Sequence, residues 1–451
     1  MLSNTAVPIH YGEFREKVLS GEIPVCEEIS LEMNRIDELI SNPDVYYDDD
    51  AITGFIDFVE SELTLTDGSE VHLLDYFKLW AEQLLSWFIF VERRVWSEEQ
   101  KEFIPKLIKK RLRDSQYLIV ARGSAKSMYV SFLQAYFLTV DTSTTQQITV
   151  APTMKQAEEV LSPIKTAITI SPGPLFKFLT DGSLQNTTGS RLGRQKLSPT
   201  KKGIENFLTN SSLEIRPMSI DKVQGLRSKY NSVDEWLSGD TREDVITALK
   251  QGASKFEDPV TIAISSEGTV RNGVGDTIKM ELSSILKGDV EQWNISIFHY
   301  KLDDVKEVPY PAMWPKANPG IGITVSYETY EADVQRAEQF PSVRNEILAK
   351  RFGLPMEGYT YFFTYEETKP HTAHQFRGMP CSLGIDLSRG DDFCAFTFLF
   401  PIRTDLFGVK TVSYITRRTL ELLPGARRAK YEEFVREKSL AVMEGTVLDM
   451  M

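Results

Sequence analysis

Two patterns of hydrophobic and polar positions alternate along the chain from about residue 70 to residue 300. Short apolar runs rich in β-branched residues alternate with longer segments in which apolar residues recur at helical spacing. The short runs are YLIVA at 117–121, QQITVA at 146–151, NSV at 231–233 and PVTIAIS at 259–265. Strands that alternate with helices are typical of a parallel sheet, so this part of the chain is predicted to form an α/β domain.

The patterns change on both sides of this region. Residues 1–65 are acidic and partly of helical pattern, whereas the stretch EVPYPAMWPKANPGIG at 307–322 is rich in Pro and Gly, as at a domain boundary. The apolar runs CSLGIDL and CAFTFLF, which begin at Cys381 and Cys394, predict a β-hairpin that opens a second domain. We therefore expect four parts, with bounds at 1–65, 66–305, 306–378 and 379–451.

Composition narrows the class of protein. The chain has 451 residues and 41% hydrophobic residues, enough for two or three globular domains. It contains no apolar run near the roughly 20 residues that cross a bilayer, and its first residues lack the pattern of a secretion signal. The three cysteines, Cys26, Cys381 and Cys394, lack metal-binding spacing and indicate reduced thiols of a cytosolic protein.

Charge is distributed unevenly. The net charge of −13 argues against indiscriminate binding of nucleic acid. Between Asn186 and Tyr230, however, nine basic residues face three acidic ones. The basic residues are Arg191, Arg194, Lys196, Lys201, Lys202, Arg216, Lys222, Arg227 and Lys229. This segment is either a docking surface for a polyanion or an ordinary solvated loop.

The stretch VARGSAKS, at 120–127, joins a strand-like run to an apolar helix-like segment. A phosphate-binding loop needs N–H groups at a helix N-terminus, a lysine for the phosphates and a Ser or Thr hydroxyl for Mg²⁺. Lys126 and Ser127 supply the lysine and the hydroxyl. Ala125 replaces the usual glycine, and we expect it to adopt ordinary right-handed backbone geometry. Apolar–Lys–Ser strings are common, so the loop alone is a weak indication.

Carboxylates and hydroxyls follow two later strand-like runs. In YNSVDEWLSGD, Asp234 and Glu235 come at the end of an apolar run. An ATPase needs one carboxylate to hold Mg²⁺ and another to polarise the attacking water, although an acid pair that caps the next helix has the same sequence. In VTIAISSEG, Ser265 and Ser266 either sense the γ-phosphate or form a polar turn.

The order of these segments resembles the large subunit of tailed-phage terminases. Strand-like runs precede ARGSAKS, APTMKQAEE, DE and SSEG in turn, and the resemblance covers roughly residues 70 to 450. In that family the loop often reads small-Arg-x-x-Gly/Ala-Lys-Ser/Thr. The resemblance implies a P-loop ATPase domain of the RecA/ASCE type at 66–305 that binds ATP with Mg²⁺. The ATP-binding loop would comprise Ala121, Arg122, Gly123, Ser124, Ala125, Lys126 and Ser127.

The resemblance also implies roles for single residues. Arg122 and Lys126 would contact the phosphates, and Asp234 would hold magnesium together with Ser127. Glu235 would be the catalytic base, and Ser265 and Ser266 would couple hydrolysis to motion. The basic loop residues Arg191, Arg194, Lys196, Lys201 and Lys202 would contact DNA.

An adenine-contacting segment is expected upstream of the phosphate loop. The stretch FKLWAEQLLSW is similar to the one in the family, with Gln83 reading the base and Trp80 nearby. The gap from Gln83 to Lys126 is long, and an ordinary amphipathic helix would show the same pattern.

The second domain begins with LGIDLSRGDDFCAF. Taken alone, DLSRGDD is a common turn composition. Placed after an ATPase domain, it resembles the opening of the RNase H-like terminase nuclease, in which two Mg²⁺ or Mn²⁺ ions activate a water. Asp386 would be the first metal ligand, and either Asp392 or Asp391 the next.

Further metal ligands are harder to find. The later acids are Asp405, Glu421, Glu432, Glu433, Glu437, Glu444 and Asp449, and none closes an apolar strand convincingly. We therefore expect the nuclease domain at 379–451 to be C-terminally incomplete, and the chain to hydrolyse ATP better than it cuts DNA.

The resemblance implies an ATP-driven motor that moves viral double-stranded DNA into procapsids, and an endonuclease that cuts concatemeric DNA. Its partners would be double-stranded DNA, the portal protein of the procapsid, the small terminase subunit and further copies in a ring. It would act in the host cytoplasm, docked on the portal. A helicase-like translocase would need a second RecA-like domain, which the sequence lacks. A scaffold without activity would tolerate loss of Lys126 and Glu235.

Overall fold

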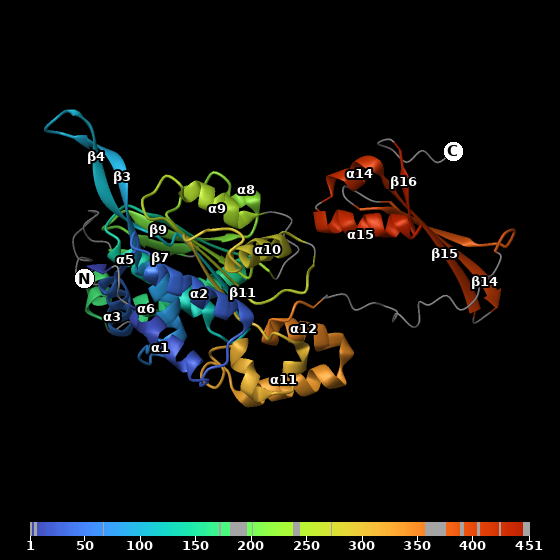
Figure 1. Cartoon of the computed structure of the whole chain (residues 1–451), viewed down its shortest axis with the longest axis horizontal. Coiled ribbons are helices and arrows are strands. Elements are labelled where there is room, and N and C mark those ends of the chain that lie inside the picture. The colour runs from blue at the N-terminus through green and yellow to red at the C-terminus, as the bar shows by residue number, and fades with distance from the viewer. Residues whose placement is uncertain are drawn as a thin grey trace, which may run out of the picture. The chain divides into compact units, whose positions relative to one another are not determined.

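The computed structural model of the chain describes residues 2–3, 7–65, 67–170, 173–180, 196–200, 202–237, 244–271, 273–356, 376–387, 392–403, 406–423 and 425–444. The chain divides into two compact units, Met1–Tyr359 and Thr360–Met451 (Figure 1).

A sheet of eight strands forms the centre of the first unit. The order of its strands is β12-β5-β11-β10-β6-β9-β8-β7. The first six are parallel, and β8 and β7 complete the edge in antiparallel pairing. The bounds are β5 Ser115–Ile119, β6 Gln146–Ala151, β7 Leu197–Thr200, β8 Gly203–Asn206, β9 Ser211–Pro217, β10 Tyr230–Asp234, β11 Val260–Ser265 and β12 Ile295–His299. The expected parallel sheet is therefore confirmed.

Helices cover both faces of this sheet. Leu118 of β5 packs into one core with α5 and α6, whereas its neighbours Tyr117 and Ile119 pack into another with α9 and α10. This alternation follows from the two-residue period of a strand. The bounds are α5 Lys126–Val140, α6 Met154–Ile170, α7 Pro174–Thr180, α8 Ile220–Val223, α9 Val245–Ala253 and α10 Val274–Leu286.

The N-terminal region belongs to the same core as α5. Its four helices are α1 Ile9–Leu19, α2 Glu27–Ser41, α3 Asp49–Glu62 and α4 Asp75–Leu85. A separate antiparallel sheet joins β1 Leu2–Ser3, β2 Tyr46–Asp48, β3 Trp87–Ser97 and β4 Glu102–Arg111. Figure 1 shows the hairpin of β3 and β4 projecting away from the body of the unit. Buried Glu32 on α2 pairs with Arg35 and Arg113, and it accepts the N–H of Ile297 at 3.2 Å, which ties α2 to β12.

The segment after β12 forms a small helical layer within the first unit. It contains η2 Val305–Glu307, η3 Pro311–Lys316, α11 Tyr327–Gln339 and α12 Pro341–Phe352. Trp314, Tyr330 and Phe352 are the aromatic centre of its own core. This layer brings α12 to the phosphate loop, as described below.

The second unit contains a four-stranded sheet in the order β13-β14-β15-β16. Its elements are β13 Ser382–Asp386, β14 Cys394–Arg403, β15 Leu406–Thr416, α14 Arg417–Leu422, α15 Gly425–Arg436 and β16 Leu440–Met443. The antiparallel pairing of β13 with β14 runs from Ser382 opposite Leu399 to Asp386 opposite Ala395. It confirms the hairpin expected at the start of the second domain.

A buried carboxylate on α4 holds the N-terminal helix in place. Glu82 is fully buried and accepts hydrogen bonds from the N–H groups of His10 and Tyr11, at 3.0 and 2.8 Å, and from the hydroxyl of Tyr47 at 2.9 Å. Burial raises the pKa of Glu82 to about 7, although these three donors oppose the change. The folded state therefore favours the protonated carboxyl more strongly than the unfolded chain does.

We predict that the stability of the first unit falls as the pH rises from about 4.5 to 7, because over this range unfolding releases the Glu82 proton that the folded state retains. In Glu82→Gln the part of this fall that Glu82 causes is absent. The difference in unfolding free energy between the two proteins should therefore shift by about 3 kcal/mol in favour of the variant across this range. All six tryptophans lie in the first unit, so denaturant unfolding followed by tryptophan fluorescence measures it. A difference that stays constant with pH would contradict the prediction.

Candidate active site

The phosphate loop lies between the end of β5 and the start of α5. Ala125 is the N-cap residue of α5 and has φ 56° and ψ 26°, in the left-handed region. The expectation of right-handed geometry at this position was therefore wrong, because the turn into the helix needs the conformation that glycine usually provides. For an alanine this costs about 1–2 kcal/mol. No side chain caps α5, which leaves the N–H groups at its N-terminus available to an anion.

Two side-chain contacts join this loop to the end of β10. Lys126 Nζ lies 2.9 Å from Glu235 Oε1. Ser127 Oγ donates a hydrogen bond of 3.1 Å to Asp234 Oδ2, across 107 residues of sequence. Both contacts arise because β5 and β10 are parallel with only β11 between them, so that their carboxyl ends share one edge of the sheet.

Asp234 and Ser127 have the chemistry of a magnesium site. Asp234 is 5% exposed, and its Oδ1 is buried without a hydrogen-bond partner among the described residues. Burial raises the pKa of Asp234 to about 6, while Lys126 opposes that change. At neutral pH the carboxylate is therefore largely ionised, and one oxygen lacks a partner that a hard cation would supply.

Glu235 lies in a different electrostatic environment. Burial alone would raise its pKa, but the ammonium groups of Lys126 and Lys350 outweigh burial and hold the pKa below its usual value. Its backbone has φ 52°, a conformation that turns Glu235 away from the line of β10. The carboxylate is therefore ionised and held at the edge of the sheet, as a base requires.

The two serines after β11 have separate contacts. Ser266 Oγ donates to Glu235 Oε2 at 3.1 Å. Ser265 Oγ accepts from Leu237 N at 3.1 Å and donates to the Ser266 carbonyl at 2.8 Å. A shift of the end of β11 would therefore change the contacts of Glu235 and of Leu237.

The structure adds residues that sequence patterns did not indicate. Arg122 N donates to the carbonyl of Lys350 at 2.9 Å, and Arg351 Nη1 donates to the Arg122 carbonyl at 3.0 Å. Thr324 Oγ1 donates to the carbonyl of Gly123. These residues come from the helical layer after β12, more than 200 positions away, and no local motif marks them.

Gln83 is part of the core of the first unit. Its side chain is fully buried, with Oε1 accepting from Trp87 Nε1 at 2.9 Å and Nε2 donating to Glu82 Oε2 at 3.5 Å. Trp80 is also fully buried, and its Nε1 donates to the Tyr300 hydroxyl at 3.1 Å. The structure therefore does not support a base-reading role for Gln83, and α4 is a core helix in which nine of eleven residues are buried.

A cavity of about 430 Å³ lies at the start of α4, and one side chain of its lining contacts the phosphate loop. Tyr76, at the start of α4, links the two, because its side chain lines the cavity and its hydroxyl donates to the Ser124 carbonyl at 3.0 Å. Much of the remaining lining is apolar and includes Phe14, Val25, Leu74, Pro319 and Ile323.

The expected DNA-contact residues are only partly described. Arg191, Arg194 and Lys201 lie outside the described residues. Lys196 Nζ donates to the Phe178 carbonyl at 2.8 Å and lies over the Phe178 ring, whereas Lys202 is exposed between β7 and β8. Lys202 thus stays accessible to a polyanion at the edge of the large sheet.

In the second unit, Asp386 is the last residue of β13 and is exposed. Asp392 Oδ1 accepts from Phe393 N at 2.9 Å and from the Tyr431 hydroxyl at 3.3 Å. Asp391 lies outside the described residues. Within the described part of the chain, neither Asp386 nor Asp392 belongs to a group of three potential metal ligands.

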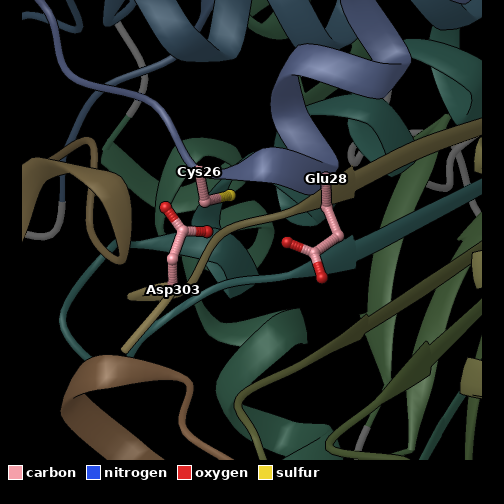
Figure 2. Close-up of side chains that lie close together, drawn as sticks. All are labelled: Cys26, Glu28 and Asp303. Carbon is pink, nitrogen blue, oxygen red and sulfur yellow. The ribbon is translucent and has the colours of Figure 1, made fainter. Parts of the chain in front are cut away.

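A separate group of potential ligands, Cys26, Glu28 and Asp303, is shown in Figure 2. Two lysines already neutralise its carboxylates, with Lys301 at 2.6 Å from Glu28 and Lys316 at 2.8 Å from Asp303. Burial raises the pKa of the Cys26 thiol to about 12, so the thiolate that binds metals is disfavoured. This cluster acts as a junction between the start of α2 and the segment after β12.

Comparison with known proteins identifies the family of the chain. The chain matches the family model for the terminase large subunit ATPase domain over residues 108–282, and the model for the terminase large subunit endonuclease domain over residues 289–451. The chain belongs to the terminase large subunit family. It is a hydrolytic enzyme with ATPase and nuclease domains that serves phage DNA packaging, which confirms the interpretation of the motif order.

The chain is also similar to individual proteins. The chain is 23% identical over 403 residues to the terminase large subunit of Lactococcus phage p2, covering 88% of this chain and 68% of the relative. It is 26% identical over 230 residues to the protein YmfN of Escherichia coli K12, covering 48% and 50% of the two chains. The crystal structure of the HK97 bacteriophage large terminase matches with a TM-score of 0.52 at 17% identity, covering 88% and 75%, which confirms the fold.

Among the described residues of this large terminase subunit, no helix has the length and apolar character needed to cross a membrane.

Proposed function

We propose that ATP is hydrolysed at the junction of the phosphate loop with β10, and that this reaction drives double-stranded DNA into procapsids. The observation that carries the proposal is the pair of contacts from Lys126 to Glu235 and from Ser127 to Asp234. It puts a phosphate-binding cation, a metal-binding hydroxyl and two carboxylates within one small site. The proposed ATPase domain spans 66–305 and the proposed nuclease domain begins at 379, with 306–378 between them.

Each residue of the site has a chemical role in this proposal. The side chains of Lys126 and Arg122 bind phosphate oxygens, together with the N–H groups from Gly123 to Ser127 at the start of α5. Ser127 and Asp234 hold Mg²⁺, which when bound would offset the negative charge of the phosphates. Glu235 accepts the proton of the attacking water, and Ser266 passes the change at Glu235 to the end of β11.

The adenosine part of ATP would occupy the cavity beside Tyr76. Three features support this: its volume of about 430 Å³, its largely apolar lining and the hydrogen bond from Tyr76 to the phosphate loop. The cavity replaces Gln83 as the proposed base site.

The second unit would supply the nuclease. We propose that Asp386, with Asp392 or Asp391, would hold divalent metal ions, Mg²⁺ or Mn²⁺, which would activate a water for cleavage of DNA. The basic residues Arg191, Arg194, Lys196, Lys201 and Lys202 would contact the DNA duplex. The portal protein, the small terminase subunit and further copies in a ring are the proposed protein partners, and the host cytoplasm at the procapsid portal is the proposed place of action.

We predict that Lys126→Ala and Glu235→Gln each lower DNA-stimulated ATP hydrolysis at least 100-fold. Lys126→Ala also weakens ATP binding, whereas Glu235→Gln retains it, because only the lysine contacts the phosphates. Lys155→Ala and Glu158→Gln, on the exposed side of α6, are the matched controls and should keep full activity. If both site variants bind and hydrolyse ATP as the wild type does, the proposal is overturned.

For the base site, we predict that Leu74→Trp fills the cavity and raises the Kd for ATP about tenfold or more, equal to about 1.4 kcal/mol. The Kd for inorganic tripolyphosphate should stay the same, because the phosphate loop is untouched. Gln83→Ala lowers the melting temperature without changing either Kd. Equal loss of ATP and tripolyphosphate binding in Leu74→Trp would count against the cavity.

For the nuclease, we predict at most slow nicking of supercoiled plasmid in Mn²⁺, because Asp386 and Asp392 have no third carboxylate beside them among the described residues. Any nicking above background should disappear in Asp386→Ala, with Glu433→Ala on α15 as the control. Rapid nicking that depends on Asp386 would show that other acids of the chain complete the site. Nicking that survives Asp386→Ala would remove Asp386 from the proposal.

A further inference from the structure

Lys350, in the last turn of α12, extends into the ATPase site from outside the ATPase domain as sequence comparison defines it. The ATPase-domain match ends at residue 282, and Lys350 falls within the endonuclease match at 289–451. Lys350 is nevertheless buried, at 9% exposure, with its Nζ 3.4 Å from Ser266 Oγ and 3.8 Å from Glu235 Oε2. A buried lysine is costly unless its charge is compensated, and Glu235 provides that compensation.

The backbone around Lys350 is fixed to the phosphate loop. Its carbonyl accepts the N–H of Arg122 at 2.9 Å. The next residue, Arg351, donates from Nη1 to the Arg122 carbonyl at 3.0 Å and from Nε to Asp333 Oδ2 at 2.7 Å. The ammonium group of Lys350 therefore extends from a point that is held relative to the loop.

The two carboxylate oxygens of Glu235 have different partners. Oε1 is 2.9 Å from Lys126 Nζ, on the phosphate-loop side. Oε2 is 3.1 Å from Ser266 Oγ and 3.8 Å from Lys350 Nζ. If Lys126 turns toward phosphate oxygens, it releases Glu235 Oε1, while Ser266 and Lys350 continue to hold Oε2. Oε1 then faces the phosphates, where the attacking water must lie.

We infer that Lys350 is a positioning residue for ATP hydrolysis, which holds Glu235 by Oε2 so that Oε1 receives the proton of the attacking water. This inference rests on the proposed ATPase site. It also makes the helical layer after β12 part of that site, since a movement of α12 relative to the loop changes the position of the base.

The test compares Lys350→Met and Lys350→Arg with the wild type in the full chain. Lys350→Met keeps length and apolar volume but removes the charge, and Lys350→Arg keeps the charge. Arg344→Met, an exposed position on the same helix, is the matched control. The measurements are kcat and KM for ATP, the Kd for a non-hydrolysable ATP analogue, and the melting temperature.

We expect Lys350→Met to lower kcat about 10-fold to 100-fold, as a misplaced base does, and to leave the Kd of the analogue within about threefold. Lys350→Arg should recover most of kcat, and Arg344→Met should match the wild type. In a Glu235→Gln background, Lys350→Met should cause no further loss, because the group that it positions is already inactive.

Three results would overturn the inference. One is an unchanged kcat in Lys350→Met. Another is a loss of kcat that parallels a fall in melting temperature and is not recovered by Lys350→Arg, which would indicate a structural role. The third is a further loss in the Glu235→Gln background. All three presuppose a wild type whose hydrolysis depends on Lys126 and Glu235; without that dependence, the proposed function itself fails.

Discussion

The ion pair of Lys126 with Glu235 is the contact around which the proposed ATPase site is arranged. Both side chains are nearly buried, at 8% and 12% exposure, where an unpaired charge would be strongly unfavourable. The pair joins the start of α5 to the end of β10, and it requires the strand order that sets β5 and β10 on either side of β11. The hydrogen-bonded pair of Ser127 and Asp234, the proposed magnesium site, lies immediately beside it, so the same strand order positions both.

The helical layer after β12 completes this arrangement. Its hydrogen bonds to Arg122 and Gly123 fix the outer side of the phosphate loop, and Lys350 supplies a second cation for Glu235. Family models divide the chain between residues 282 and 289, but the compact unit continues to Tyr359. The physical unit that holds the ATPase site is thus larger than the region that carries its motifs. A rearrangement of this layer would change the geometry of the base directly.

Sequence patterns succeeded where the chemistry is local. The β-branched runs predicted the parallel strands, and the adjacent acids after one of them predicted the residues that meet Lys126 and Ser127. Sequence patterns failed where the role of a residue depends on whether its side chain is buried. Gln83 sits on a helix whose amphipathic pattern does not reveal that its amide is enclosed with Trp87 and Glu82. The prediction of right-handed geometry at Ala125 was wrong for a related reason. The identity of a residue does not reveal the backbone turn that its neighbours impose.

The sequence by itself determined the class of fold, the phosphate loop, the acid pair and the hairpin that opens the second unit, because each depends on neighbours within a few residues. Tertiary structure alone decided which polar side chains are buried, where a cavity opens beside Tyr76, and that Lys350 reaches Glu235. The contact of Tyr76 with Ser124 joins residues 48 positions apart, and the contact of Lys350 with Glu235 joins residues more than 100 positions apart. Their formation depends on how the layers pack, and no local pattern in the chain encodes that packing.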